Sequence, residues 1–371
     1  MKRIVIIGGG FAGLSALHTL QSKQALYEII LIDKKKASDF LPLLPDIISG
    51  RVRPEHLCYS FDYVKKRFGV DFIHDTVTAI DVHNKKIITR RQVVEYDFVI
   101  IACGSETNFY GNTDIQNNAY TLDSVSDAQY IVNTIKKKLP AIIVVCGGGY
   151  TGIEVITNTW RYCKKRNVNM RLCIVERDPS LIPTLPSWMQ IYTYSNMKSL
   201  GIDIYCNTTI DHLRDNSIIL SDGTHLPNAM VIWTAGVKIP DFIQTVDAEH
   251  ISQGRIAVDQ YLRINESCYI VGDAASVVYK NVPLRMSVQF SLMEGRHAAE
   301  NIKRSLQGNP LRPFKPVDLG FIIPMANNKS CGSVRGIPVR GRGATLLHYG
   351  MCLFRTFTIP NKIGILKDLL L

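Results

Sequence analysis

The sequence lacks several features that would place it in a specialised class of protein. No stretch approaches the roughly 20 apolar residues that a membrane-spanning helix requires. Only four aliphatic residues precede the first glycine run, too few for the apolar part of a secretory signal peptide. No low-complexity linker interrupts the 371 residues, of which 46% are hydrophobic and 20% are charged. This composition predicts a folded chain of two or three domains.

The sequence also lacks closely spaced pairs of cysteines. The nine cysteines are odd in number, and no two are spaced as C-x-x-C. Several stand alone within apolar runs, as small buried hydrophobic residues do: Cys103, Cys146, Cys173 and Cys268. The pattern argues against a disulfide scaffold and against a zinc site, and it favours a reducing compartment. We expect no metal centre.

Acidic residues are scarce near the C-terminus. Residues 301–371 carry 11 lysines and arginines but only two acids, Asp318 and Asp368. This region therefore supplies +9 of the formal net charge of +11, and the first 300 residues supply +2. Such an asymmetry indicates a region that meets an anionic surface, either nucleic acid or membrane.

One order of elements, strand, glycine turn, helix and strand, occurs twice. The aliphatic run over 3–7 is typical of a buried parallel strand, and helical spacing over 12–20 precedes a second strand over 28–32. About 140 residues later come a strand over 141–146, a helix starting near Tyr150 and a strand over 172–175. The repeat predicts an α/β fold with parallel, doubly wound sheets.

Two hairpins are expected outside this repeat. The first turns around residues 83–85, within a strand-rich stretch over 71–101. The second joins a strand over 217–220 to a strand over 229–233 through the Asp-Gly pair at 222–223.

The first glycine turn has the pattern G-x-G-x-x-G, and Asp33 follows 20 residues after it. Gly8 permits the tight turn, Gly10 lets the backbone approach a pyrophosphate, and Gly13 permits close packing of helix and strand. The helix N-terminus offers unpaired N–H groups to the phosphates. Asp33 can accept hydrogen bonds from ribose hydroxyls. Together these features predict a dinucleotide site rather than a merely structural turn.

The second glycine turn, residues 147–152, repeats the pattern, and Glu176 follows the next strand. An acid at this position accepts hydrogen bonds from a ribose diol and repels a 2′-phosphate, which favours NADH over NADPH. The neighbouring Arg177 could pair with a phosphate, so NADPH stays open as the less favoured donor.

Two dinucleotide turns in one chain resemble the FAD/NAD(P) two-dinucleotide flavoprotein superfamily. Residues 97–105 resemble the family segment in which the chain leaves the FAD domain, and residues 233–237 resemble its counterpart on the return. Residues 268–275 resemble the second FAD motif, in which Asp273 would hold the ribityl chain. Cys103 stands where the family usually has threonine.

The resemblance implies two Rossmann-like dinucleotide-binding domains with the NAD domain inserted in the FAD domain, plus a C-terminal membrane-docking segment. The expected boundaries are 1–112 and 238–305 for the FAD-binding domain, 113–237 for the NAD(H)-binding domain, and 306–371 for a basic and apolar C-terminal region.

Within the superfamily the chain resembles the type II NADH dehydrogenases, which are single-chain NADH:quinone oxidoreductases. Residues 40–50 resemble the segment that these enzymes lay beside the isoalloxazine ring. Disulfide reductases have a redox-active cysteine pair in this region, but no cysteine lies between Asp33 and Cys58. Residues 148–154 resemble the family's G-G-x-T-G-x-E, which implies that Glu154 lies near the junction of nicotinamide and flavin. Alternatively, Glu154 is an acid that only complements the helix dipole.

Residues 288–295 resemble the helix on the quinone side of the flavin, usually A-Q-x-A-x-Q. Gln289 matches, but Met293 replaces the second glutamine, and the adjacent Glu294 could substitute for it. This departure leaves the electron acceptor open. A structural alternative is that Gln289 only caps a packed helix.

The resemblance therefore implies Glu154, Gln289 and Glu294 as candidate catalytic residues. The implied FAD-binding residues are Gly8, Gly10, Phe11, Ala12, Gly13, Asp33, Lys34, Pro42, Leu43, Ala102, Cys103, Gly104, Gly272, Asp273 and Gln289. The implied NAD-binding residues are Gly147, Gly149, Tyr150, Thr151, Gly152, Glu176, Ala235 and Gly236.

The C-terminal tail combines apolar residues with basic ones. The twelve residues 343–354 contain no acid, lysine or arginine, and Leu347, Met351 and Phe354 fall on one helical face. The segment is too short to span a bilayer but suits its interface, and this mixture favours an anionic membrane over nucleic acid. We therefore expect residues 340–371 to dock on the cytoplasmic side of a membrane as a peripheral, monotopic anchor. The alternative is a helix that packs on protein, as in a homodimer.

The implied reaction passes a hydride from NADH to FAD and then two electrons to a membrane quinone, without proton pumping. Three alternatives stay open. A sulfide:quinone oxidoreductase would need cysteines at the flavin, for which Cys331 and Cys163 are candidates. A nicotinamide-dependent reductase of a soluble electron carrier would leave the tail unexplained. A flavoprotein that NADH regulates would instead act in signalling.

Overall fold

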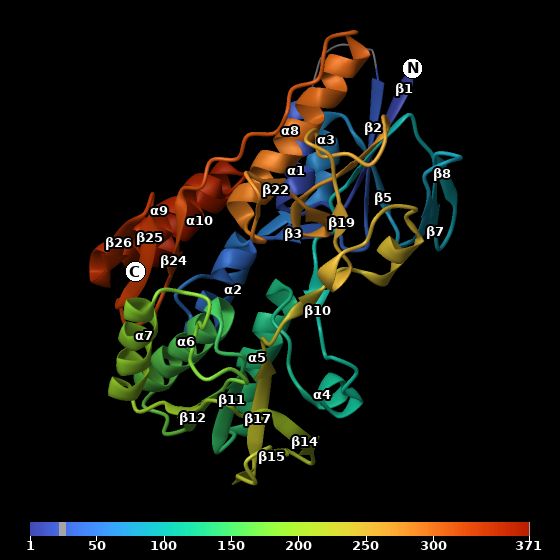
Figure 1. Ribbon diagram of the computed structural model, residues 1–371. Coiled ribbons are helices and arrows are strands. Elements are labelled where there is room, and N and C mark those ends of the chain that lie inside the picture. The colour runs from blue at the N-terminus through green and yellow to red at the C-terminus, as the bar shows by residue number, and fades with distance from the viewer. Residues whose placement is uncertain (22–26, 371) are drawn as a thin grey trace. The chain divides into compact units, whose positions relative to one another are not determined.

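The computed structural model describes residues 1–21 and 27–370, and their contacts divide them into two compact units (Figure 1). Unit 1 contains 1–38, 59–106 and 237–318, and unit 2 contains 39–58, 107–236 and 319–371. Residues 39–58 and 319–371 cluster with unit 2. The domain boundaries expected from the sequence concern where each cofactor binds, and they stay a prediction.

Unit 1 is built on a parallel sheet in the order β20-β9-β1-β2-β5. Its strands are β1 (Lys2–Ile7), β2 (Tyr27–Asp33), β5 (Asp71–His74), β9 (Phe98–Ile101) and β20 (Cys268–Ile270). In β1 the side chains of residues 4–7 are buried, as expected for a strand covered on both faces. The carboxyl ends of these strands share one edge of the sheet, where ligands of such folds bind.

Helices α1 (Phe11–Leu20) and α8 (Val288–Leu306) pack against each other in unit 1 (Figure 1). A Cβ atom added at Gly295 would lie 2.0 Å from the carbonyl oxygen of Ala12, so only glycine allows this approach. The remaining helix is α3 (Phe61–Phe68), and the 3-10 turns are η3 (Asp241–Thr245), η4 (Ser252–Gly254) and η5 (Gly272–Ala274).

The hairpin expected around residues 83–85 is present in unit 1. Strand β6 (Val77–Asp81) pairs antiparallel with β7 (Lys86–Thr89), which pairs with β8 (Val93–Glu95). Unit 1 also contains the short pairs β19 (Ile256–Ala257) with β21 (Ala275–Ser276) and β22 (Val278–Tyr279) with β23 (Val282–Pro283).

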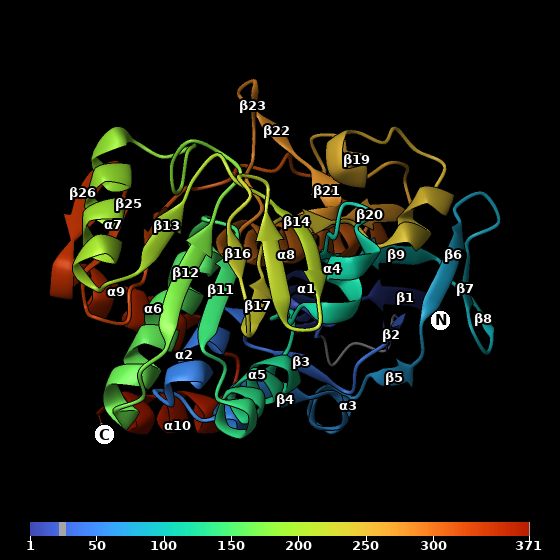
Figure 2. The same cartoon turned by 90° about the horizontal axis from the view of Figure 1, so that it is seen from below.

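Unit 2 contains the second parallel sheet, in the order β13-β12-β11-β17 (Figure 2). Its strands are β11 (Ile142–Cys146), β12 (Arg171–Val175), β13 (Asp203–Tyr205) and β17 (Ala229–Trp233). Its helices before residue 319 are α2 (Leu44–Ser49), α4 (Thr113–Asn118), α5 (Val125–Lys138), α6 (Tyr150–Arg166) and α7 (Ser187–Ser199), and its 3-10 turns include η1 (Leu41–Leu43) and η2 (Pro54–His56). The sequence repeat therefore corresponds to two Rossmann-like sheets.

The prediction for the second hairpin was wrong about one of its two strands. Strand β15 (Ser217–Leu220) pairs with β16 (His225–Leu226) and with β14 (Ile210–Arg214), whereas β17 runs parallel to β11. Every residue of β17 is buried, so this strand belongs in the interior of a sheet rather than in an exposed hairpin.

The C-terminal part of unit 2 is a small antiparallel sheet followed by two helices. The elements are β24 (Gly320–Ile323), β25 (Ser330–Val334), β26 (Ile337–Arg340), α9 (Gly341–Arg355) and α10 (Ile359–Leu370). Among the described residues no helix is both long enough and apolar enough to cross a bilayer. Leu371, the last residue of the expected tail, lies outside the described residues.

Four short strands lie where the chain passes from one unit to the other. They are β3 (Ala37–Asp39), β4 (Cys58–Ser60), β10 (Glu106–Thr107) and β18 (Val237–Lys238).

Candidate cofactor and active sites

The first glycine turn follows β1 directly and leads into α1. Gly8 has φ +97°, in the region that favours glycine, and a Cβ atom at Gly13 would lie 1.9 Å from the Gly8 carbonyl oxygen. At Gly10 an added Cβ atom would meet nothing within 4 Å. Helix α1 begins beside this open space, and no side chain caps its N-terminus. The backbone N–H groups there suit a phosphate.

Asp33 ends β2 and reaches back to the same turn. Its Oδ2 accepts a hydrogen bond from the N–H of Gly9 at 2.7 Å, and its Oδ1 accepts one from the N–H of Lys35 at 2.7 Å. Burial raises the pKa of Asp33, and these two hydrogen bonds oppose that rise. A carboxylate has about four lone-pair positions, so it can still accept from a ribose hydroxyl.

The second glycine turn has the same construction between β11 and α6. Gly147 has φ +109°, and a Cβ atom at Gly152 would lie 1.8 Å from the Gly147 carbonyl oxygen. An added Cβ at Gly149 would meet nothing within 4 Å. Glu176 accepts from the N–H of Gly148 at 2.5 Å and from the N–H of Asp178 at 2.9 Å. Both turns therefore fit a dinucleotide.

Four further predicted residues of unit 1 lie at η5 or on α8: Gly272, Asp273, Gln289 and Glu294. Asp273 accepts from the hydroxyl of Ser105 at 2.7 Å, and Glu294 accepts from the N–H of Gly272 at 2.7 Å. Gln289 donates from Nε2 to Asp318 at 2.9 Å. This hydrogen bond connects the first turn of α8 to Asp318, in the segment that follows the helix.

Among the predicted residues of unit 1, Glu294 and Cys103 have strongly shifted pKa values. Burial raises the pKa of Glu294 to about 7, against the opposing effects of the Gly272 N–H and Arg255. Burial likewise raises the pKa of the Cys103 thiol to about 12, which keeps it protonated at neutral pH. Glu294 can therefore carry and release a proton near neutral pH, whereas the Cys103 thiol is not poised to react as a thiolate.

The remaining predicted residues divide between the units. Unit 1 holds Phe11, Ala12, Lys34, Ala102 and Gly104, and unit 2 holds Pro42, Leu43, Tyr150, Thr151, Glu154, Ala235 and Gly236. Lys34 Nζ lies 3.7 Å from Glu106 Oε2. A Cβ atom added at Gly147 would lie 3.0 Å from the backbone of Ala235, so these two segments are tightly packed. Pro42 and Leu43 belong to η1.

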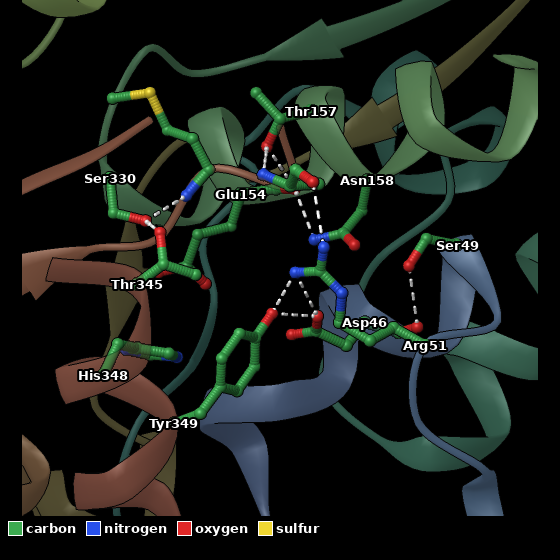
Figure 3. A network of polar contacts seen from close by, with 12 residues as sticks. Asp46, Ser49, Arg51, Glu154, Thr157, Asn158, Ser330, Thr345, His348 and Tyr349 are labelled. Carbon is green, nitrogen blue, oxygen red and sulfur yellow. Dashed lines mark hydrogen bonds and ion pairs between the residues drawn. The ribbon is translucent and has the colours of Figure 1, made fainter. Parts of the chain in front are cut away.

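Unit 2 also contains a buried polar network that the sequence did not reveal (Figure 3). Asp46 of α2 is only 2% exposed, and its Oδ1 accepts a hydrogen bond from the hydroxyl of Tyr349 on α9 at 2.7 Å. Arg51 donates to the same tyrosine hydroxyl and, at 2.9 Å, to the carbonyl oxygen of Ala326. The sequence signal was weak: one acid within an apolar run, and one tyrosine in a segment expected to meet a membrane.

Glu154 lies on α6, which packs against α2, beside this network (Figure 3). Burial, and then the charge of Asp46, hold the pKa of Glu154 well above its ordinary value. No hydrogen bond or ion pair within the described residues reaches its carboxyl group. Glu154 therefore retains its proton at a pH where an exposed glutamate has lost it.

Two cysteines considered for sulfide chemistry are unsuited to it. Cys331 has no exposed surface and contacts the Thr193 hydroxyl, and burial raises the pKa of its thiol. Burial also raises the pKa of Cys163, to about 11. Both thiols are thus protonated and shielded, whereas a cysteine nucleophile reacts as the thiolate.

Helix α9 has two different faces. Its inner face buries Ala344, Thr345, His348, Tyr349 and Cys352. On the outer face Leu346 is 73% exposed, Leu347 41% and Phe354 83%. Helix α10 likewise exposes Ile359, Ile363, Leu366 and Leu370. Part of the tail therefore packs on protein, while its other side presents apolar residues to the surroundings.

Comparison with known proteins agrees with this architecture. The family model described as pyridine nucleotide-disulphide oxidoreductase matches residues 2–298, and the chain belongs to this family. It is therefore an oxidoreductase of a family that uses FAD and a nicotinamide dinucleotide.

Relatives narrow the resemblance further. A type II NADH:quinone oxidoreductase of Staphylococcus haemolyticus (strain JCSC1435) is 25% identical over 374 positions, covering 93% of each chain. The structure of NDH2 from Plasmodium falciparum in complex with NADH has a TM-score of 0.88 at 17% identity, covering 100% of this chain and 97% of that one. The sulfide:quinone oxidoreductase of Aquifex aeolicus has a TM-score of 0.81 at 17% identity, covering 98% and 92%. The resemblance to type II NADH dehydrogenases seen in the motifs is confirmed, and the two structures show the shared fold.

Proposed function

We propose that the protein oxidises NADH and reduces a membrane quinone, without pumping protons. The observation that carries this proposal is the second glycine turn, which repeats the geometry of the first and is followed by an acid in the same place. A chain with two such turns can hold a donor dinucleotide as well as a flavin. The full-length likeness to a type II NADH:quinone oxidoreductase supports quinone as the acceptor.

We assign FAD to the first turn, with Asp33 at its ribose and Asp273 near its ribityl chain. The nicotinamide dinucleotide is assigned to the second turn, with Glu176 at its ribose. FAD, when bound, supplies the ability to accept a hydride and to release electrons to a quinone. The chain supplies alignment, exclusion of water and proton donors, for which Glu154 and Glu294 are the candidates.

We further propose that α9 and α10 dock on an anionic membrane surface. Their exposed apolar side chains are accompanied by basic residues, among them Arg340, Arg342, Lys362 and Lys367. Apolar area and positive charge both favour an anionic bilayer over water. The alternative is that these helices pair two copies of the chain. Such an interface would use the same apolar residues but would not depend on anionic lipid.

One set of assays tests the proposal. We expect the purified protein to be yellow, NADH to bleach its flavin, and a water-soluble quinone to restore the colour with NADH preferred over NADPH. A colourless protein, or a flavin that NADH does not bleach, would overturn the function. Sulfide-dependent quinone reduction without NADH would instead support the sulfide:quinone alternative.

Membrane docking is tested by flotation with vesicles that contain or lack anionic lipid. We expect the wild-type protein to float with anionic vesicles, and Leu346→Ser/Phe354→Ser to remain at the bottom. The exposed Tyr130→Ser, on α5 and 62% exposed, is the matched control and should float. A double variant that floats like the wild type, or becomes monomeric without losing vesicle binding, contradicts docking through this face.

A further inference from the structure

The buried network of unit 2 joins two segments that are distant in the sequence. Asp46 comes from α2, Arg51 follows that helix, and Tyr349 comes from α9 about 300 residues later (Figure 3). The hydrogen bonds run in one direction, from Arg51 to the hydroxyl of Tyr349 and from that hydroxyl to Asp46. Arg51 Nη1 also lies 3.6 Å from Asp46 Oδ1. Burial raises the pKa of Asp46, and the charge of Arg51 and the hydrogen bond from Tyr349 oppose that rise by favouring the ionised form.

Glu154 has the opposite surroundings. Its carboxyl group makes no hydrogen bond or ion pair within the described residues, and the neighbouring charge that acts on its pKa is that of Asp46. Two carboxyl groups in one poorly solvated place do not both ionise at neutral pH, because each charge disfavours the other. The proton therefore stays on the member that lacks donors.

Other ionisable groups face the pair from the packed elements. On α6, Arg161 is the second cation, and its Nε is buried without a partner among the described residues. On α9, burial lowers the pKa of His348 to about 4, so this histidine is neutral, and burial raises the pKa of Cys352. Arg51 and Arg161 act on Asp46, whereas Asp46 is the charge that acts on Glu154.

We propose that Asp46 is a positioning residue for the reaction, and that its charge, fixed by Tyr349 and Arg51, keeps the proton on Glu154. This inference rests on the proposed function, in which Glu154 serves as a proton donor. A donor must carry its proton at the working pH, and an exposed glutamate does not. Asp46 provides that condition without touching the reacting groups. Tyr349 contributes by holding Asp46 in its ionised form from the inner face of α9.

The test compares Asp46→Asn with Asp46→Glu in the flavin-loaded enzyme. Asparagine retains an oxygen that can accept from Tyr349 but loses the charge, and Arg51 keeps its acceptors on Tyr349 and Ala326. We expect the ratio of D46N to wild-type kcat for quinone reduction to fall about tenfold from the acid to the alkaline end of the pH profile. The D46E ratio should stay level. In a Glu154→Gln background, D46N should no longer change the shape of the profile.

A merely structural role gives a different result. The inference is overturned if D46N lowers kcat by the same factor at every pH. It is also overturned if D46N still changes the shape of the pH profile of kcat in the Glu154→Gln background. Thermal unfolding and flavin content measured on each variant separate loss of fold from loss of the proton.

Infrared difference spectra of the flavin-loaded protein provide a readout independent of turnover. We expect the wild type near neutral pH to show the carbonyl band of a protonated carboxylic acid that E154Q removes, and D46N to lose this band at lower pH. Absence of the band in the wild type overturns the inference even if D46N does not fold. If the band responds to D46N but no quinone is reduced, the link between Asp46 and Glu154 is supported and the proposed function is overturned.

Discussion

The two glycine turns have nearly the same backbone, yet their surroundings differ. The residue before the helix has φ −77° and ψ −162° at Gly10, and φ −77° and ψ −169° at Gly149. The middle glycine, however, faces the ring of Phe61 in unit 1, where a Cβ atom at Gly9 would lie 2.3 Å from it. In unit 2 a Cβ at Gly148 would meet Leu181 at 2.7 Å. The turn geometry, which suits a phosphate, is thus shared by the two units, while the side chains beside its middle glycine differ.

The two glutamates whose pKa is raised, one in each unit, also differ in their surroundings. Glu294 in unit 1 accepts a backbone hydrogen bond and has Arg255 to offset its burial. Glu154 in unit 2 has neither, and Asp46 adds a like charge. The two glutamates can therefore stay protonated for different reasons. Burial raises the pKa of Glu294 although a hydrogen bond and Arg255 oppose the rise, whereas the charge of Asp46 adds to the effect of burial on the pKa of Glu154.

The largest expected effects come from Gly13→Ala and Gly152→Ala, which break the two turns one at a time. Each new Cβ would lie within 2 Å of a backbone carbonyl oxygen, at 1.9 Å and 1.8 Å. Such overpacking costs about 1–3 kcal/mol, or about five- to 150-fold in cofactor affinity. We expect G13A to lose its flavin, measured as absorbance per protein. We expect G152A to retain flavin that NADH bleaches poorly, measured by stopped flow.

Gly10→Ala and Gly149→Ala are the matched controls for stability. The added methyl group meets no protein atom within 4 Å, so the thermal midpoint should change little, whatever happens to cofactor binding. If G13A retained flavin and G152A lost it, the assignment of cofactors to the two turns would be reversed.

The second prediction concerns Glu294→Gln. The pKa of Glu294 is raised from 4.5 to about 7 in the folded protein, so the folded state binds more protons than the unfolded state between these values. Stability contributed by the protonated form is complete at low pH and is lost as pH rises, by about 3 kcal/mol above pH 7. Denaturant unfolding of the flavin-loaded protein should show this decline in the wild type and a smaller one in E294Q.

Glu300→Gln on the same helix provides the control. Glu300 is 44% exposed and pairs with Arg296 at 2.9 Å, so its loss should leave the pH dependence as in the wild type. Equal pH dependence in E294Q and the wild type would refute the role of Glu294.

The smallest expected effect is a change in donor preference. Glu176→Gln can still accept from the N–H of Gly148 but no longer repels a 2′-phosphate. The ratio of kcat/KM for NADPH to that for NADH should rise about tenfold, which corresponds to about 1.4 kcal/mol. Arg177→Ala is the counterpart, because Arg177 is 74% exposed and available to a phosphate. It should lower the ratio, and an unchanged ratio in both variants would contradict the proposed roles.

Local patterns were sufficient to predict much of the fold. Buried strands, glycine turns and amphipathic helices follow one another along the chain, and each depends on residues close in sequence. The hairpin that ended at 229–233 failed because an all-apolar strand fits either a hairpin or the interior of a sheet. Only the pairing of β17 with β11 decided between them.

The sequence by itself determined the two dinucleotide turns and the acids that follow them, because turn, strand and helix are specified within about 30 residues. Only the tertiary structure brought together Asp46, Arg51 and Tyr349. Residues 298 and 303 positions apart become neighbours when α9 packs in unit 2, and no local pattern records that contact. Tertiary structure also divided α9 into a buried polar face and an exposed apolar one, since burial depends on what packs against a helix and not on its sequence alone.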